Sequence, residues 1–116
     1  MRVLIGALAV ALLAGCAGST MEAARHNSPT RIFTSNKAEN VVAQCVQFAW
    51  QDESVFGVDA GAFLEPRKSG GFTVYTTGAE SFADVQGGAS GTNVNYYAAL
   101  DNWIAQRRLA ALATCM

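Results

Sequence analysis

Three cysteines, Cys16, Cys45 and Cys115, are the side chains of this sequence with the widest chemistry. A thiol can be acylated or paired in a disulfide, and as a thiolate it can bind a metal ion. The only histidine, His26, lies outside the part of the chain that we expect to fold, so the serines there have no histidine base. Four carboxylates could pair only if the fold brought them together: Asp59, Glu65, Glu80 and Asp84. We therefore predict no catalytic residues and a protein that is not an enzyme.

The first cysteine follows a segment with the composition of a secretory signal peptide. Arg2 supplies a positive charge, residues 3–12 are apolar, and Ala14 and Gly15 are the small residues typical of a cleavage site. The apolar run is well short of the roughly 20 residues that a membrane-spanning helix needs. We expect residues 1–15 to be removed.

The tetrapeptide Leu13-Ala14-Gly15-Cys16 resembles the lipobox of bacterial lipoproteins. The resemblance implies that the first three residues are recognised by the signal peptidase, and that Cys16 receives a diacylglycerol thioether and an acylated amino terminus. Two or three acyl chains anchor a protein far more firmly than one, because each buried CH₂ contributes about 0.8 kcal/mol. In proteobacteria an aspartate after the cysteine usually retains such proteins at the inner membrane. Ala17 stands there instead, which implies the periplasmic leaflet of the outer membrane, with the inner membrane as the alternative.

Assigning Cys16 to lipid leaves Cys45 and Cys115 in an oxidising compartment. We predict a disulfide between them, closing a loop of about 70 residues that the chain-entropy model credits with roughly 4 kcal/mol. Two free buried thiols are the alternative. A metal pair is discounted, because two cysteines and one distant histidine cannot supply the four ligands of a zinc site. No metal and no cofactor is expected.

Length and charge limit the domain organisation and the partners. About 100 residues follow the signal segment, enough for one small domain. Residues 16–29 are rich in Gly, Ser, Thr, Asn and Pro without clear periodicity, which predicts a flexible tether before a single domain over 30–116. The formal net charge is −1 and no basic stripe is present, so nucleic acid is not an expected partner. The expected partners are the membrane, through the lipid on Cys16, and an unknown envelope protein or glycan.

The first predicted helix would carry Cys45. Asn36 and Glu39 have the spacing of a capping box, which predicts a helix over 37–51. Its expected buried stripe, at three- and four-residue spacing, consists of Val41, Val42, Cys45, Phe48 and Ala49. Val46 and Trp50 would flank this stripe.

The remainder alternates between turn signals and runs of β-branched and aromatic residues. These runs predict strands over 30–35, 62–67, 72–77, 80–85 and 92–97. The glycine-rich segment 86–91 is interpreted as a hairpin turn, because it lacks the Lys-Ser/Thr of a phosphate loop and precedes a strand. A second helix over 98–116 would place Cys115 near its end. We expect an α+β domain, with an antiparallel sheet of four to five strands and two helices packed on one face, in the order strand, helix, strands, helix.

The lipobox, the segment Glu39 to Cys45, the tract Val94 to Tyr97 and the terminal-helix cysteine together resemble a class of short proteobacterial lipoproteins of unknown function. The resemblance implies the same layout of elements. It supplies no catalytic residues.

Two functions fit these expectations. The preferred one is a membrane-anchored periplasmic lipoprotein that acts as a non-enzymatic interaction module of the cell envelope, through its sheet or glycine-rich loops. The alternative is a binder or inhibitor of an envelope ligand or hydrolase, possible contacts being Tyr75, Tyr96, Tyr97 and Trp103. Packing of the helices on the sheet is the simpler explanation of these aromatics. A phage-derived lipoprotein that excludes a second phage would also fit the size and the anchor.

Overall fold

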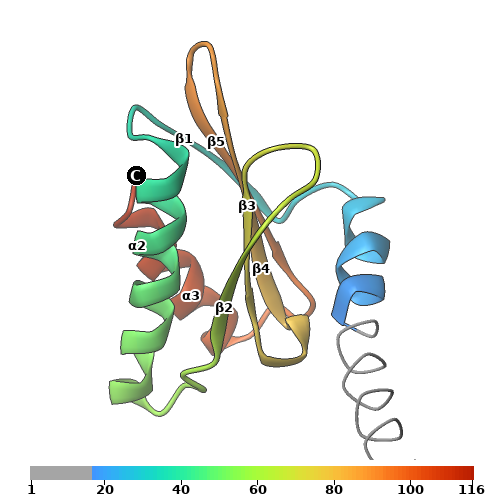
Figure 1. Ribbon diagram of the computed structural model, residues 1–116. Helices are drawn as coiled ribbons and strands as arrows, with labels where there is room; N and C mark the ends of the chain where they lie inside the picture. Colours follow the sequence, from blue (N-terminus) through green and yellow to red (C-terminus); the bar gives the residue numbers. More distant parts are fainter. Residues whose placement is uncertain (1–16) are drawn as a thin grey trace, which may run out of the picture.

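The computed structural model describes residues 17–116. The predicted signal segment, including Leu13, Ala14 and Gly15, and the predicted acylation site Cys16 lie outside the described residues. The described chain begins with a helix over 17–25. The elements that follow, coloured in chain order in Figure 1, are β1 (Arg31–Ser35), α2 (Glu39–Asp52), the 3₁₀ turn η1 (Glu53–Phe56), β2 (Ala62–Pro66), β3 (Phe72–Thr76), the 3₁₀ turn η2 (Thr77–Ala79), β4 (Ser81–Gly88), β5 (Gly91–Ala98) and α3 (Trp103–Ala113).

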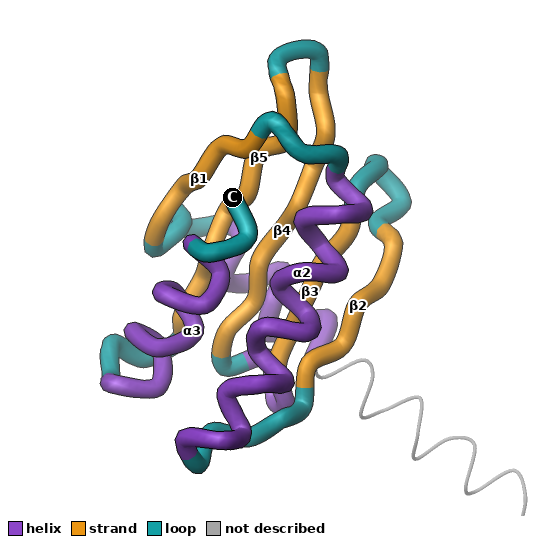
Figure 2. Tube along the Cα trace, turned by 90° about the vertical axis from the view of Figure 1, so that its left-hand side faces the viewer, coloured by secondary structure: helices purple, strands orange, loops and turns teal. Residues whose placement is uncertain are grey.

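The strands form one antiparallel five-stranded sheet in the order β1-β5-β4-β3-β2. Helices α2 and α3 cover one face, which we call the inner face, and the helix over 17–25 lies on the opposite, outer face (Figures 1 and 2). This arrangement confirms the predicted α+β class, the antiparallel sheet and the placement of two helices on one face. Among the described residues, no helix is long and apolar enough to cross a membrane.

The main core lies between the inner face and the two helices. Alternate strand residues point into it, so that Val74, Ala83 and Tyr96 occupy one cross-strand row and Val85 and Val94 the next. The helices contribute side chains that are almost fully buried: Val42, Ala43, Val46, Trp50 and Leu112. This core holds α2 and α3 against the sheet.

Helix α2 forms where expected but is rotated relative to the predicted stripe. Its buried residues are Val42, Ala43, Val46 and Trp50, whereas Val41 and Phe48 are 49% and 59% exposed. The indole N–H of Trp50 donates to the Arg108 carbonyl at 2.8 Å, so Trp50 lies inside the core and not at its flank. Of the predicted stripe, Val42 is buried and Cys45 and Ala49 pack against the core, so the prediction was wrong at Val41 and Phe48.

The predicted capping box is also absent. The helix starts two residues later than predicted, at Glu39, with Ala38 as an N-cap that makes no side-chain bond. Glu39 instead accepts a hydrogen bond from the backbone N–H of Gly87, near the end of β4, at 2.6 Å. A contact with a distant strand thus replaces the local cap.

Residues 17–25 correct the prediction of a flexible tether over 16–29. They form a helix, and Met21 on its sheet-facing side is only 3% exposed. Met21 packs with Ala79, Phe82 and Tyr97 in a second, smaller core on the outer face. Order in this segment comes from burial against a sheet that lies far away in the sequence.

Candidate functional site on the outer sheet face

A row of aromatic side chains crosses four strands of the outer face. Phe63, Tyr75, Phe82 and Tyr97 are paired in register from β2 to β5. The Phe82 and Tyr97 rings stack with centroids 4.5 Å apart, and those of Phe63 and Tyr75 lie 5.3 Å apart. The helix over 17–25 covers the Phe82 and Tyr97 part of this row through Met21. Most of the aromatic surface on this half of the face is therefore already occupied.

Asp84 is the polar centre of the outer face. Its side chain is 6% exposed and accepts two hydrogen bonds from the Arg25 guanidinium, each at 2.8 Å, and a third from the Thr73 hydroxyl at 2.7 Å. Arg67 lies 3.6 Å from the same carboxylate. Hydrogen bonding to Asp84 is the main cause of the raised pKa of Arg25, and burial opposes it. The two-point contact fixes the C-terminal end of the helix over 17–25 on the sheet.

Beyond Asp84, the outer face is open. Gln86 and Asn93 are cross-strand neighbours, and Asn95 lies beside Asp84 in the adjoining row. Together with Ile32 and Arg67 they line a shallow depression of about 510 Å³. We call these five residues the amide patch. Each amide offers both donors and an acceptor, so the patch can bind a polar partner through several hydrogen bonds.

Of the four aromatic residues suggested by the sequence, only Tyr75 and Tyr97 lie on the same face of the sheet. Tyr75 and Tyr97 lie on the outer face of the sheet, whereas Tyr96 lies on the inner face, in the main core, with 1% of its surface exposed. The Tyr96 hydroxyl donates to the Ala105 carbonyl at 3.0 Å. Trp103, 58% exposed, begins α3. Neighbouring residues of one strand point to opposite faces, so Tyr96 and Tyr97 cannot line a single site.

Burial raises the pKa of each of these tyrosines. It is the largest effect for Tyr75, Tyr96 and Tyr97. The carboxylate of Glu65 adds to the rise in the pKa of Tyr75, and that of Asp84 to the rise for Tyr97. All three phenols therefore stay protonated, as hydrogen-bond donors, at neutral pH.

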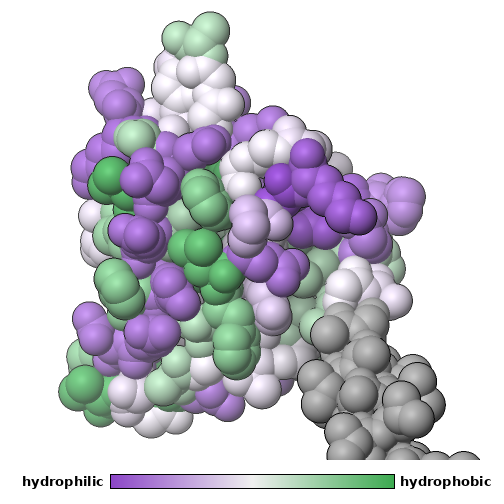
Figure 3. Space-filling model, viewed as in Figure 1, coloured by the Kyte–Doolittle hydropathy of each residue, from purple (hydrophilic) through white to green (hydrophobic). Residues whose placement is uncertain are grey.

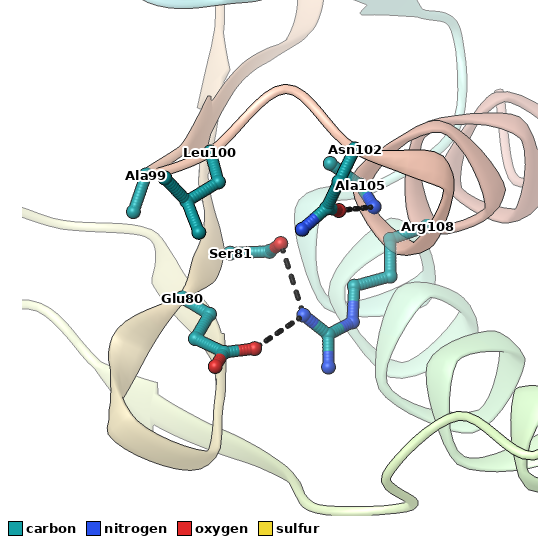
Figure 4. Close-up of a pocket in the computed structure, with 7 residues that line it drawn as sticks. All are labelled: Glu80, Ser81, Ala99, Leu100, Asn102, Ala105 and Arg108. Atoms are coloured by element: carbon teal, nitrogen blue, oxygen red, sulfur yellow. Dashed lines mark hydrogen bonds and ion pairs between the residues drawn. The ribbon is translucent and has the colours of Figure 1, made fainter.

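A second polar cluster lies on the inner face where α3 meets the sheet (Figure 4). Arg108 is 3% exposed and donates to the Ser81 hydroxyl at 3.2 Å and to Glu80 at 3.5 Å. The cavity beside it holds only about 20 Å³, no more than a water molecule needs. This cluster joins α3 to β4 and leaves no room for a substrate.

The disulfide predicted from the cysteine count is present. Cys45 of α2 is bonded to Cys115, just beyond α3, with their Cα atoms 5.7 Å apart. Cys115 is fully buried in the main core. The bond therefore joins the middle of α2 to the segment that follows α3.

The carboxylates considered from the sequence have separate surroundings. Asp59 accepts from the backbone of Gly61, Glu80 contacts Arg108 and Asp84 binds Arg25. Among residues 17–116, no three His, Cys, Asp or Glu side chains are placed to hold a metal ion.

The residues that best define a site on this face are not those that the sequence singled out. The signal for the amide patch was available, since Asp84 and Gln86 on β4 and Asn93 and Asn95 on β5 repeat with the period of two of a strand. The contact between Arg25 and Asp84 spans 59 residues and has no local sequence signature.

No protein-family model, curated protein or solved structure matches this chain.

Proposed function

We propose that this protein is a lipid-anchored lipoprotein of the bacterial envelope, acylated on Cys16, that binds an envelope protein through the amide patch. The lipobox-like tetrapeptide ending at Cys16 supports the anchor, and Ala17 after it supports the periplasmic leaflet of the outer membrane. No catalytic step is assigned to it. The resemblance to short proteobacterial lipoproteins belongs to the same proposal.

The main observation in favour of a binding function is that the helix over 17–25 covers only part of the outer face. The helix over 17–25 buries Phe82 and Tyr97, while Gln86 and Asn93 in neighbouring strands stay exposed beside a depression of about 510 Å³. Exposed amides on paired strands can exchange water for a partner's polar groups at little entropic cost. Ile32, 63% exposed on the edge strand β1, adds apolar area at the rim.

The test is recovery of a partner from envelopes after mild cross-linking, with the acylated full-length chain as bait. We expect a reproducible partner that is lost from the double variant Gln86→Ala, Asn93→Ala. Both side chains are exposed, so the variant should keep its fold. Gln44→Ala is the matched control, because Gln44 is an exposed amide on α2, across the sheet from the patch.

Recovery of the same partner by the double variant would overturn the assignment of the patch. A Cys16→Ser variant found in the soluble periplasm, while the parent chain stays with membranes, would support the anchor. Equal distribution of the two would contradict the anchor.

The second candidate is a glycan ligand, favoured by the chemistry of the same patch. Amides and an arginine are planar polar groups that pair with sugar hydroxyls, and the depression falls within the volume range of small-ligand sites. Titration of labelled protein with soluble glycan-strand fragments would shift the amide resonances of Gln86, Asn93 and Asn95. Shifts that persist in the Gln86→Ala, Asn93→Ala variant would contradict this candidate.

A further inference from the structure

We propose that the domain is held directly against the bilayer in one orientation, with an apolar end formed by Val55, Phe56, Leu100 and Trp103 facing the lipid. This inference rests on the proposed acylation of Cys16. It goes beyond that anchor because a lipid on a flexible tether would leave the domain free to turn.

The helix over 17–25 removes the spacer between anchor and domain. Cys16 is bonded to Ala17, and from residue 17 onward the chain is helical and docked on the outer face. Met21 is buried there and Arg25 is fixed by two hydrogen bonds to Asp84. A lipid on Cys16 would thus be connected to the sheet through a docked helix.

The start of this helix lies at one particular end of the molecule. Thr20 lines a hollow of about 250 Å³ together with Ala79 from the turn between β3 and β4 and Ala98 and Ala99 at the end of β5. Leu100 follows Ala99 directly. In Figure 1 the helix over 17–25 starts at its lower end, toward the end of the fold where β5 stops and α3 begins.

Large apolar side chains are exposed at this same end. Val55 is 82% exposed, Leu100 68%, Phe56 59% and Trp103 58%. Val55 and Phe56 belong to η1 at the foot of α2, where Figure 3 shows strongly hydrophobic surface at the lower left. Four of the eight large apolar side chains that are exposed among residues 17–116 lie at this end, which indicates a surface that is covered in use.

Contacts between η1 and α3 show that these residues are neighbours. The Arg107 guanidinium lies over the Phe56 ring, 3.8 Å from its centroid, and binds Glu53 at 2.6 Å. Trp103 is one helical turn before Arg107 and therefore lies on the same side of α3. Tryptophan at such a position suits the boundary between lipid and water, where its indole N–H stays hydrated.

The exposed charged residues at this end indicate which lipid headgroups it can contact. Asp52, Asp59, Glu80 and Asp101 are exposed around the apolar residues, while Arg107 is already paired with Glu53. The acids would be repelled by anionic headgroups and tolerated by zwitterionic ones. The bilayer surface that fits is therefore a zwitterionic one, contacted at the headgroup level.

The orientation also places the amide patch. Strand β4 runs from Ser81 at the membrane end to Gly88, and β5 returns from Gly91, so Gln86 and Asn93 lie toward the opposite end. At about 3.4 Å per residue, Gln86 lies roughly 17 Å further along β4 than Ser81. The patch would face away from the membrane, accessible to a partner.

Tryptophan fluorescence tests the orientation. The full acylated chain is reconstituted in zwitterionic vesicles whose lipids carry bromine on the acyl chains. Of the two tryptophans, Trp50 is 1% exposed in the core and Trp103 is exposed at the apolar end. We expect quenching of up to about half of the emission, loss of that quenching in Trp103→Phe, and weaker quenching when anionic lipid is added.

The possible failures are distinguishable. A chain that floats with vesicles but whose Trp103 emission is unaffected by bromine would overturn the orientation and leave the anchor intact. A chain that fails to float, as Cys16→Ser should, would overturn the anchor itself.

A spacer variant tests the role of the docked helix. Insertion of about ten Gly and Ser residues between Cys16 and Ala17 lets the domain move away from the lipid without altering its fold. We expect flotation to be unchanged and the quenching of Trp103 to fall several-fold. Undiminished quenching would show that the docked helix does not set the orientation.

Discussion

Arg108 is a buried charged side chain in the middle of α3, where the helix meets the sheet. Only 3% of its surface is exposed, whereas the Glu80 side chain that it contacts is 66% exposed. A buried guanidinium is stabilised by its hydrogen bonds and by the packing of its aliphatic part. An exposed carboxylate that loses its arginine partner can bind water instead, at little cost in free energy. The two members of this ion pair therefore contribute unequally.

We predict that Arg108→Ala lowers the free energy of unfolding by about 2–4 kcal/mol, because it removes packing and the bond to Ser81. Glu80→Gln should lower it by less than about 1 kcal/mol. Urea denaturation followed by far-ultraviolet circular dichroism measures both. Similar losses for the two variants would contradict the unequal contributions.

Tyr96 makes stability depend on alkaline pH. Burial raises its pKa above the value near 10 of an unfolded chain, so the folded protein holds this proton more tightly than the unfolded one. The contribution of protonated Tyr96 to the free energy of unfolding is complete below about pH 10. It is lost as the pH rises through the folded-state pKa of Tyr96.

We therefore expect Tyr96→Phe to flatten the fall in the free energy of unfolding above about pH 10. At neutral pH the variant should lose about 1 kcal/mol, because the hydroxyl no longer donates to Ala105. Tyr75 and Tyr97 also have raised pKa values, so some alkaline loss should persist. An unchanged alkaline slope would contradict the contribution of Tyr96.

At the scale of elements, the positions of the strands were predictable from the sequence, although β4 continues to Gly88, into the segment 86–91 that was predicted as a turn. The phase of α2 was not predictable. Phe72–Thr76 and Gly91–Ala98 lie within about a residue of the expected strands, since β-branched and aromatic residues between glycines specify a strand locally. In α2, apolar residues occupy more than one side, and the side that is buried depends on contacts such as Trp50 with Arg108. Local periodicity does not contain that information.

The helix over 17–25 was still less predictable from local sequence patterns than the buried side of α2. Nine residues form a marginal helix in water, and their composition is typical of a linker. Their partner, Asp84, is 59 residues away. At the candidate site, the alternation of polar residues along β4 and β5 could be predicted from the sequence. Which half of the outer face the helix covers could not.

The disulfide joins α2 to the end of the chain across 70 residues. We predict that the double variant Cys45→Ala, Cys115→Ala loses about 2–5 kcal/mol of unfolding free energy, chiefly because its unfolded chain is less constrained. Reductant should destabilise the parent chain to a similar degree and leave the double variant unchanged. Urea denaturation with and without dithiothreitol makes the comparison, and a reductant effect on the double variant would contradict this assignment.

At the scale of the whole molecule, the sheet separates two cores of unequal size. The inner core contains both helices α2 and α3 and the disulfide, while the outer core consists of Met21, Ala79, Phe82 and Tyr97. Because the outer core is small and depends on one short helix, it should open without unfolding of the rest. That separation would allow the proposed membrane orientation to be altered without destroying the fold.

We predict that Met21→Asp releases the helix over 17–25 alone, since a carboxylate cannot be buried unpaired against Phe82. Hydrogen exchange should show loss of protection at residues 17–25, while the amides of α2 keep theirs. Leu112→Ala, at a fully buried inner-core position, is the matched control and should lower protection throughout the domain by about 2–5 kcal/mol. Loss of protection in α2 of the Met21→Asp variant would show that the two faces unfold as one unit, and the docked helix would then be part of the fold and not a separable connection to the membrane.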